Sequence, residues 1–299
     1  MKQAATIILT LAFAATVFAQ DAKPQGQTPP PSQPAAGQPA GQTAAQPATP
    51  PAGKRMPQAK TQPEYDAFQA ATASQDPAAV EKAATDFNTK FPDSELRVVL
   101  YKMAMRGYQN AGNADKMLEM GRKALAIDAN DPESLIDVSQ VLAERTRDTD
   151  LDKDQKLDEA MKMAQHSLET IDTDLPLPAN TEQAKIDAAK ALLRSSAYSI
   201  IGTLKFNKND FTGAEADLRK SIDAYPQQPD PVTVLRLALA IDKQGKYPDA
   251  LVVANRAVEL TQEGTPVGSL ARKERDRLVQ LTGGAAPKPA AQGQTPPKN

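Results

Sequence analysis

SSAYSIIGTLKFNKNDFTGAEADLRKSIDAYPQQ, residues 195–228, is the stretch that decides the fold. In its first half, Tyr198, Ile201 and Gly202 have the i, i+3, i+4 spacing of one helix face. A polar break at 207–210 follows, and Ala214 and Leu218 then share a face of a second helix. A helix pair this short cannot bury its apolar stripe alone, so it needs neighbours of the same kind stacked against it.

The chain supplies such neighbours between residues 64 and 282, where helix start and stop signals alternate. Asp-Pro and Thr-Pro steps start helices, and Gly, Asn and Phe-Pro steps end them. Asn180 with Gln183 reads as a capping box, and Asp93 or Ser94 as a cap. No segment predicts a strand. The expected helices are 63–74, 77–90, 95–110, 114–127, 132–145, 157–171, 181–206, 211–225, 231–244, 247–262 and 266–282.

The spacing of small, aromatic and leucine residues resembles that of the tetratricopeptide repeat family, which repeats over about 34 residues. The matching positions are Tyr198, Ile201, Gly202, Phe211, Ala214, Leu218 and Pro226; Leu237, Ala238, Gly245, Tyr247, Ala250, Ala254 and Ala257; and Tyr101, Ala104, Tyr108, Gly112, Ala124 and Leu125. The resemblance implies an all-α, right-handed α-solenoid of antiparallel helix pairs, with about five pairs and a C-terminal capping helix. Gly202 is expected where two helix axes approach closely, because only a small residue fits there.

The two ends of the chain differ from the helical part in composition. Residues 1–19 combine one lysine, an apolar run of about 15 residues and a Val-Phe-Ala end, which predicts a signal peptide cleaved after Ala19. The alternative is an uncleaved anchor, but the run is shorter than the roughly 20 residues that span a bilayer. Residues 20–63 and 283–299 are rich in Pro, Gln and Ala, which predicts a disordered linker and tail around the domain at 64–282. We read Lys54, Arg55 and Lys60 in the linker as solubilising residues.

Charge and motif content exclude several classes of function. Residues 64–282 carry 28 Lys and Arg against 36 Asp and Glu, whereas a nucleic-acid surface needs a basic stripe. The chain has no cysteine, so it has no disulfide, no thiolate metal site and no site for lipid attachment at a cysteine. It also lacks phosphate-loop, nucleophile-elbow and metalloprotease motifs, and its one histidine, His166, has no second catalytic group near it in sequence. We therefore expect no enzyme and no cofactor.

In the family that the chain resembles, the first helix of each pair lines a concave groove that holds a peptide. That resemblance places a partner groove on Lys102, Arg106, Gln109, Asp137, Gln140, Ser199, Thr203, Phe206 and Arg236. Each of these residues could equally belong to a solvated helix face. Members of the family that bind a peptide's C-terminal carboxylate use a fixed set of Lys, Asn and Arg in successive repeats, and only Lys102 and Arg236 are similar to it.

An acidic stretch at 148–159, DTDLDKDQKLDE, offers a second kind of site. Asp148, Asp150, Asp152, Asp154 and Glu159 occupy positions 1, 3, 5, 7 and 12 of a calcium-binding loop. The sixth position, where the sharp turn needs glycine, is Lys153. The competing interpretation is a solvated, charged loop between two helices.

The sequence thus predicts a non-enzymatic scaffold that binds a protein or peptide partner, with no nucleic acid and no membrane span after signal cleavage. The stretch FNTKFPDSELR, residues 87–97, resembles repeat edges of bacterial envelope and cell-division proteins, which favours the periplasm over secretion to the medium. The alternative functions are a calcium-dependent module and a groove for small molecules or glycans, although few aromatic residues are present to stack on sugars.

Overall fold

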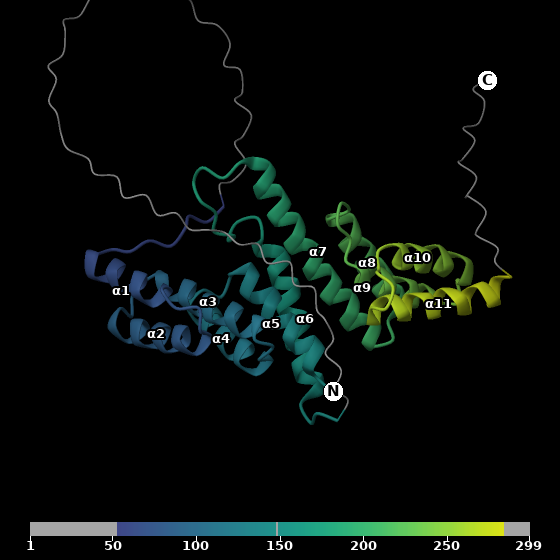
Figure 1. The fold of residues 1–299 in the computed structure, drawn as a ribbon, viewed down its shortest axis with the longest axis horizontal. Helices are drawn as coiled ribbons and strands as arrows, with labels where there is room; N and C mark the ends of the chain where they lie inside the picture. The colour runs from purple at the N-terminus through teal and green to yellow at the C-terminus, as the bar shows by residue number, and fades with distance from the viewer. Residues whose placement is uncertain (1–52, 148, 284–299) are drawn as a thin grey trace, which may run out of the picture. The chain divides into compact units, whose positions relative to one another are not determined.

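The computed structural model describes residues 53–147 and 149–283, and within these ranges the secondary structure is helical apart from one isolated β-bridge between Arg55 and Leu177 (Figure 1). The predicted signal peptide, most of the predicted linker and nearly all of the predicted tail lie outside these ranges. No helix in the described ranges is long and apolar enough to cross a membrane. The helices are α1 (Gln62–Thr72), α2 (Pro77–Lys90), α3 (Leu96–Asn110), α4 (Ala114–Ile127), α5 (Pro132–Arg145), α6 (Lys153–Thr170), α7 (Gln183–Asn207), α8 (Phe211–Ala224), α9 (Pro231–Asp242), α10 (Tyr247–Glu259) and α11 (Pro266–Thr282).

The helices pack in chain order, each against the helix before it and the helix after it. Within the described residues they form five pairs, α1/α2 to α9/α10, followed by the single helix α11. First helices also meet one another, as α5 meets α7 and α7 meets α9. The predicted all-α architecture of helix pairs with a terminal helix is confirmed.

Local capping explains where most of these helices begin. Asp76, Asp131, Asp230 and Thr265 each precede a proline and accept a hydrogen bond from a backbone N–H in the first turn of α2, α5, α9 and α11. Such a cap satisfies one of the N–H groups that a helix start leaves without a partner. Ser94 acts similarly ahead of α3, since its hydroxyl oxygen accepts from the Leu96 N–H at 3.1 Å.

Two predicted helix starts are wrong. The expected capping box at Asn180 and Gln183 does not form, because α7 begins at Gln183 after Glu182 and no side chain caps it. The helix expected from residue 157 begins four residues earlier, at Lys153. Asp154 lies in its first turn, where a carboxylate interacts favourably with the positive end of the helix dipole, so acidic residues extend this helix rather than delay it.

The core consists of three groups of buried residues along the chain of helices. The first lies in α1–α4, the second in α5–α7 and the third in α8–α11. Alanine is the commonest residue among the fully buried side chains, and Ala104, Ala164, Ala214 and Ala254 are examples. Several of these alanines also belong to the repeat-like spacing in the sequence. Their small side chains allow neighbouring helices to pack closely.

Residues 53–60, which we call the N-terminal strap, lie against the helical domain instead of belonging to the linker. The strap's Lys54 ammonium contacts the Asp128 carboxylate at 2.6 Å, and its Arg55 guanidinium contacts Glu95 at 2.6 and 2.8 Å. The backbone of the strap also makes a hydrogen bond, since the Leu177 N–H donates to the Lys54 carbonyl at 3.3 Å. The strap therefore touches the turns before α3, α5 and α7. Residues of the predicted linker therefore contact the helical domain, and Lys54 and Arg55 serve as ion-pair partners in addition to any effect on solubility.

We expect replacement of both Lys54 and Arg55 by glutamine to release the strap at a small cost in stability. Both ion pairs are partly exposed, so solvent screening keeps their contribution to stability small. The informative measurement is hydrogen exchange of the Leu177 amide, which should become faster while amides in the core of α9 are unaffected. Unchanged exchange at Leu177 would mean that the ion pairs do not hold the strap.

Candidate functional site

Charged residues of α3 and α5 form a cluster on the face of the first helices. The Lys102 ammonium lies 2.7 Å from Asp131 Oδ2 and 2.7 Å from Glu133 Oε2, and Arg106 Nη2 lies 2.7 Å from the same Glu133 oxygen. The Lys102 side chain is only 10% exposed. Its burial alone would lower its pKa, but Glu133 and Asp131 raise the pKa above the ordinary value, so the ammonium stays charged. The Lys102 ammonium is therefore already paired with two carboxylates of the protein. The Arg106 side chain, by contrast, is half exposed.

Asp137 lies one turn after Glu133 on α5 and belongs to the same cluster. Burial, with the charge of Glu133 adding to it, raises the pKa of Asp137 to about 7, although Arg106 and Lys102 act in the opposite direction. Asp131 also raises it. Among the described residues no side chain or backbone group donates a hydrogen bond to this carboxyl. Asp137 is thus a partly buried acid whose carboxyl group receives no hydrogen bond from its described neighbours.

We expect replacement of Asp137 by asparagine to flatten the pH dependence of stability. The folded-state pKa of about 7 lies above the unfolded value of about 3.9. The stabilising contribution of this group is therefore complete below about pH 4 and is lost as the pH rises to about 7. At pH 8 the variant should melt several degrees above the native protein, because the difference between the two pKa values corresponds to about 4 kcal/mol at most. At pH 4 the two should melt together, and a constant difference between pH 4 and pH 8 would contradict the raised pKa.

Hydroxyl groups and one arginine join α7 to α9 on the same face. Ser199 Oγ and Thr233 Oγ1 lie 2.7 Å apart, and the Arg236 guanidinium donates to Thr203 Oγ1 at 2.8 Å. Burial lowers the pKa of Arg236, although Asp230 and Glu144 partly compensate. No carboxylate among the described residues contacts its guanidinium. Arg236 can therefore donate to an acceptor brought by a partner.

Gln140 and Glu144 occupy the stretch of α5 between these two groups. The Gln140 amide donates to Glu144 Oε1 at 2.9 Å, and Glu144 interacts electrostatically with Arg236. Seven of the nine predicted groove residues belong to these groups on α3, α5, α7 and α9: Lys102, Arg106, Asp137, Gln140, Ser199, Thr203 and Arg236. We call these seven residues the first-helix face and refer to them, in chain order, as a row.

The other two predicted groove residues have different surroundings. Phe206 packs edge-on against Phe211 at 5.3 Å between ring centroids and joins the core of α8–α11. Its apolar ring packs between α7 and α8, so it is not available as a polar group of the first-helix face. Gln109 is half-buried near the end of α3, and no side-chain hydrogen bond links it to the cluster.

The sequence analysis missed Glu133, Glu144 and Thr233. The first two share a helix face with Asp137 and Gln140, since 133, 137, 140 and 144 follow the i, i+4, i+7, i+11 spacing. That spacing was available in the sequence. Thr233 follows Asp230 at the start of a helix and could only be interpreted there as part of a cap.

The acidic stretch does not converge on a common point in the residues that the structure describes. Asp150 accepts from the Arg147 N–H, and both Asp150 and Asp152 pair with Lys156, at 3.4 and 2.9 Å. Glu159 is paired with Arg122 of α4 at 2.9 Å. Asp154 lies in the first turn of α6, and Asp148 lies outside the described residues. In those residues no group of three or more His, Cys, Asp or Glu is arranged to hold a metal ion.

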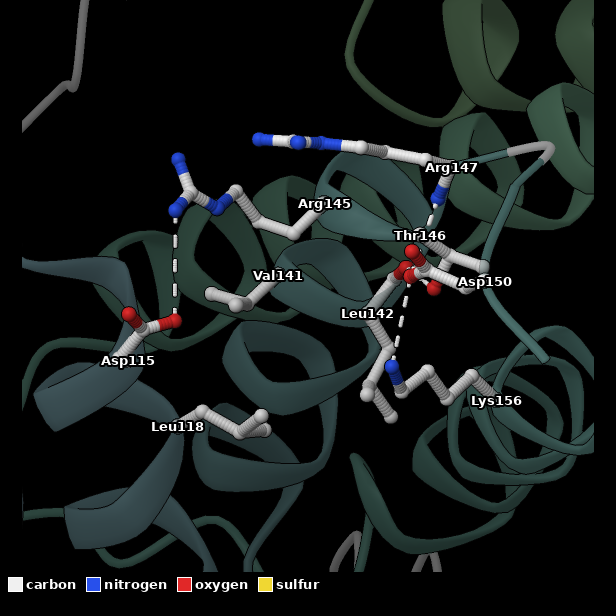
Figure 2. Close-up of a pocket in the computed structure, with 9 residues that line it drawn as sticks. All are labelled: Asp115, Leu118, Val141, Leu142, Arg145, Thr146, Arg147, Asp150 and Lys156. Carbon is white, nitrogen blue, oxygen red and sulfur yellow. Dashed lines mark hydrogen bonds and ion pairs between the residues drawn. The ribbon is translucent and has the colours of Figure 1, made fainter. Parts of the chain in front are cut away.

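Beside this loop, a cavity of about 230 Å³ opens between α4, α5 and the α5–α6 connection. Figure 2 shows its residues, with Leu118, Val141 and Leu142 contributing the apolar part. Charged side chains surround that part, from Asp115, Arg145, Arg147, Asp150 and Lys156. The cavity is separate from the predicted groove residues, none of which lines it.

Comparisons with known proteins found similar solved structures but no similar sequence. No protein-family model matches the chain, and no curated protein sequence matches it. Similar solved structures include a thermophilic TPR protein from Thermus thermophilus, with 13% identity and a TM-score of 0.44, covering 71% of this chain and 98% of that one. A tetratricopeptide repeat protein from Parabacteroides merdae has 12% identity and a TM-score of 0.38, covering 75% and 88%. The protein MamA has 14% identity and a TM-score of 0.38, covering 60% and 94%.

Proposed function

We propose that this protein is a non-catalytic scaffold of the cell envelope that binds a peptide or protein segment along the first-helix face. The observation that supports the proposal is that polar side chains of neighbouring first helices contact one another, Lys102 and Glu133 between α3 and α5, and Ser199 and Thr233 between α7 and α9. An extended peptide crossing several first helices would meet donors and acceptors at each helix. Because the row spans four repeats, its specificity would come from the order of charges along it.

Two members of the row have capacity left for a partner. Asp137 accepts no hydrogen bond from the described residues, and Arg236 donates only to a neutral hydroxyl among them. Buried polar groups gain most from a partner when their own protein leaves them incompletely paired. Lys102, by contrast, is committed to Asp131 and Glu133 and supports the face structurally.

Placement in the envelope rests on the sequence of residues 1–19. A signal peptide cleaved after Ala19 would leave Gln20 as the first residue of the mature protein. N-terminal sequencing of the protein from a fractionated cell tests this directly. A mature protein that begins at residue 1 in the cytoplasmic fraction would rule out export.

Affinity capture from an envelope extract tests the binding face. The full chain serves as bait beside a variant that carries Arg106→Gln and Asp137→Asn. The matched control carries Lys82→Gln and Asp86→Asn, which removes one cation and one anion from the exposed face of α2, a second helix. A specific partner should be retained by the native chain and the control and lost by the face variant. Equal capture by all three would show that the partner binds elsewhere.

The calcium-dependent alternative predicts a different result in the same experiment. It would require Glu159 to leave Arg122 and the two aspartates to leave Lys156 before they could ligate an ion. Capture by the scaffold should be the same with and without a chelator. Loss of the partner in chelator would favour the acidic loop.

A further inference from the structure

The cavity beside the α5–α6 connection owes its existence to the length of that connection. Residues 146–152 link α5 to α6, whereas residues 111–113 link α3 to α4 and residues 208–210 link α7 to α8. The longer connection brings Thr146, Arg147 and Asp150 to one side of a space whose other sides are α4 and α5. Leu118, Val141 and Leu142 contribute the apolar part of its lining, beneath the charged side chains (Figure 2).

The positive charges around the cavity are incompletely neutralised. Arg145 has one acidic neighbour, Asp115, at 4.0 Å, and both side chains are more than half exposed. The guanidinium of Arg147 makes no hydrogen bond or ion pair with the described residues. Lys156 is better satisfied, since it pairs with both Asp150 and Asp152.

Asp150, which interacts electrostatically with Arg147, is itself engaged. Asp150 accepts from the Arg147 backbone N–H at 3.3 Å and from Lys156 at 3.4 Å. Figure 2 shows the guanidinium groups of Arg145 and Arg147 projecting over the Val141 side of the cavity, away from the contact between Asp150 and Lys156. One side of the cavity therefore offers two guanidinium groups with spare donors, above an apolar interior.

We propose that this cavity binds a small carboxylic acid, with its apolar body against Leu118, Val141 and Leu142 and its carboxylate between Arg145 and Arg147. Guanidinium and carboxylate groups match in shape and charge, and such charge-assisted hydrogen bonds are the strong ones. A cavity of about 150 Å³ holds benzene, so the 230 Å³ available here has room for an aromatic ring with a short acidic arm. The site is distinct from the first-helix face and would act independently of it.

Methyl NMR spectra of the full chain, titrated with phenylacetate and with phenylacetamide, test this assignment. The two probes share shape and ring but differ in charge. We expect saturable shifts of the Leu118, Val141 and Leu142 methyl groups with phenylacetate, and binding about tenfold weaker with the amide. Absence of saturable shifts at these methyl groups at millimolar phenylacetate would overturn the proposal, and equal affinity for the two probes would overturn the role of the arginines.

Substitutions separate the charged rim from the apolar interior. Arg145→Gln with Arg147→Gln should weaken phenylacetate about tenfold and leave phenylacetamide unchanged. Val141→Phe should abolish binding of both probes by filling the cavity. If that variant fails to fold, the double arginine variant still decides the question, because both arginines are exposed. Equal loss of both probes in the arginine variant would contradict a carboxylate contact.

A second cavity provides the matched control. It measures about 110 Å³, lies between α8, α9 and α10, and is also lined by two arginines, Arg219 and Arg256. It is smaller than the space that benzene needs. Arg219→Gln with Arg256→Gln should leave phenylacetate binding unchanged, and an effect equal to that of the Arg145 and Arg147 variant would show that the probe responds to net charge alone.

Discussion

Replacement of Lys102 by alanine is expected to lower the free energy of unfolding by about 3–5 kcal/mol. The substitution leaves Asp131, which is almost fully buried, without its cation, and leaves Glu133 with Arg106 alone. Asp131 would keep only the Ser134 N–H that it caps, and a buried carboxylate without a cation loses more than the net value of the original pair. Urea unfolding followed by helical circular dichroism would measure it.

Arg106→Ala is the control for this prediction. Arg106 contacts the same Glu133 oxygen as Lys102 does, but its side chain is 50% exposed, so its removal should cost less than about 1 kcal/mol. Similar losses for the two variants would mean that burial does not distinguish the two cations. The difference also makes Lys102 unsuitable for testing partner binding, since its loss would change stability as well as the binding face.

Gly202→Leu is the second substitution with a large expected effect, a loss of about 1–3 kcal/mol or more. A Cβ atom at Gly202 would lie 2.7 Å from Leu218 Cγ and 3.1 Å from the Leu218 backbone nitrogen. Leu218 is fully buried in the core of α8, so it cannot turn aside without moving α8 away from α7. Thermal unfolding should show a midpoint several degrees below that of the native protein.

Two further substitutions isolate the contact from other effects of a larger side chain. Ala216→Leu adds an apolar side chain at an exposed position of α8 and should leave stability almost unchanged. Gly202→Ala should be intermediate, because alanine favours the helix by about 1 kcal/mol over glycine but its Cβ still meets Leu218. A Gly202→Leu protein as stable as the native one would show that residue 202 does not lie at a helix crossing.

The fold could be predicted from the sequence because its signals are local. Asp76, Asp131 and Asp230 each stand before a proline, and helix starts follow at all three. Apolar spacing then identifies which face of each helix is buried, as at Ala214 and Leu218, both of which are fully buried. The error at the start of α6 arose because a run of acidic residues reads as a loop, although the same residues also favour a helix N-terminus.

The candidate site could be predicted only in part, because spacing assigns a residue to a face but not to a partner. Lys102 and Arg106 share a face of α3, yet one is buried in two ion pairs and the other is half exposed. That difference depends on Glu133, which lies on another helix. The contacts of the strap could not be predicted for the same reason, since nothing near Lys54 or Arg55 in the sequence indicates Asp128 or Glu95 as a partner.

The path of the strap bears on how the domain would respond to tension. A pull on the chain ahead of residue 53 would reach the contacts at Asp128, Glu95 and Leu177 before it reached α1. The load would be shared among three repeats, so their contacts would be sheared together instead of α1 being peeled away first. Single-molecule stretching from the N-terminus should therefore record a first rupture at a higher force than in a chain whose Lys54 and Arg55 have been replaced.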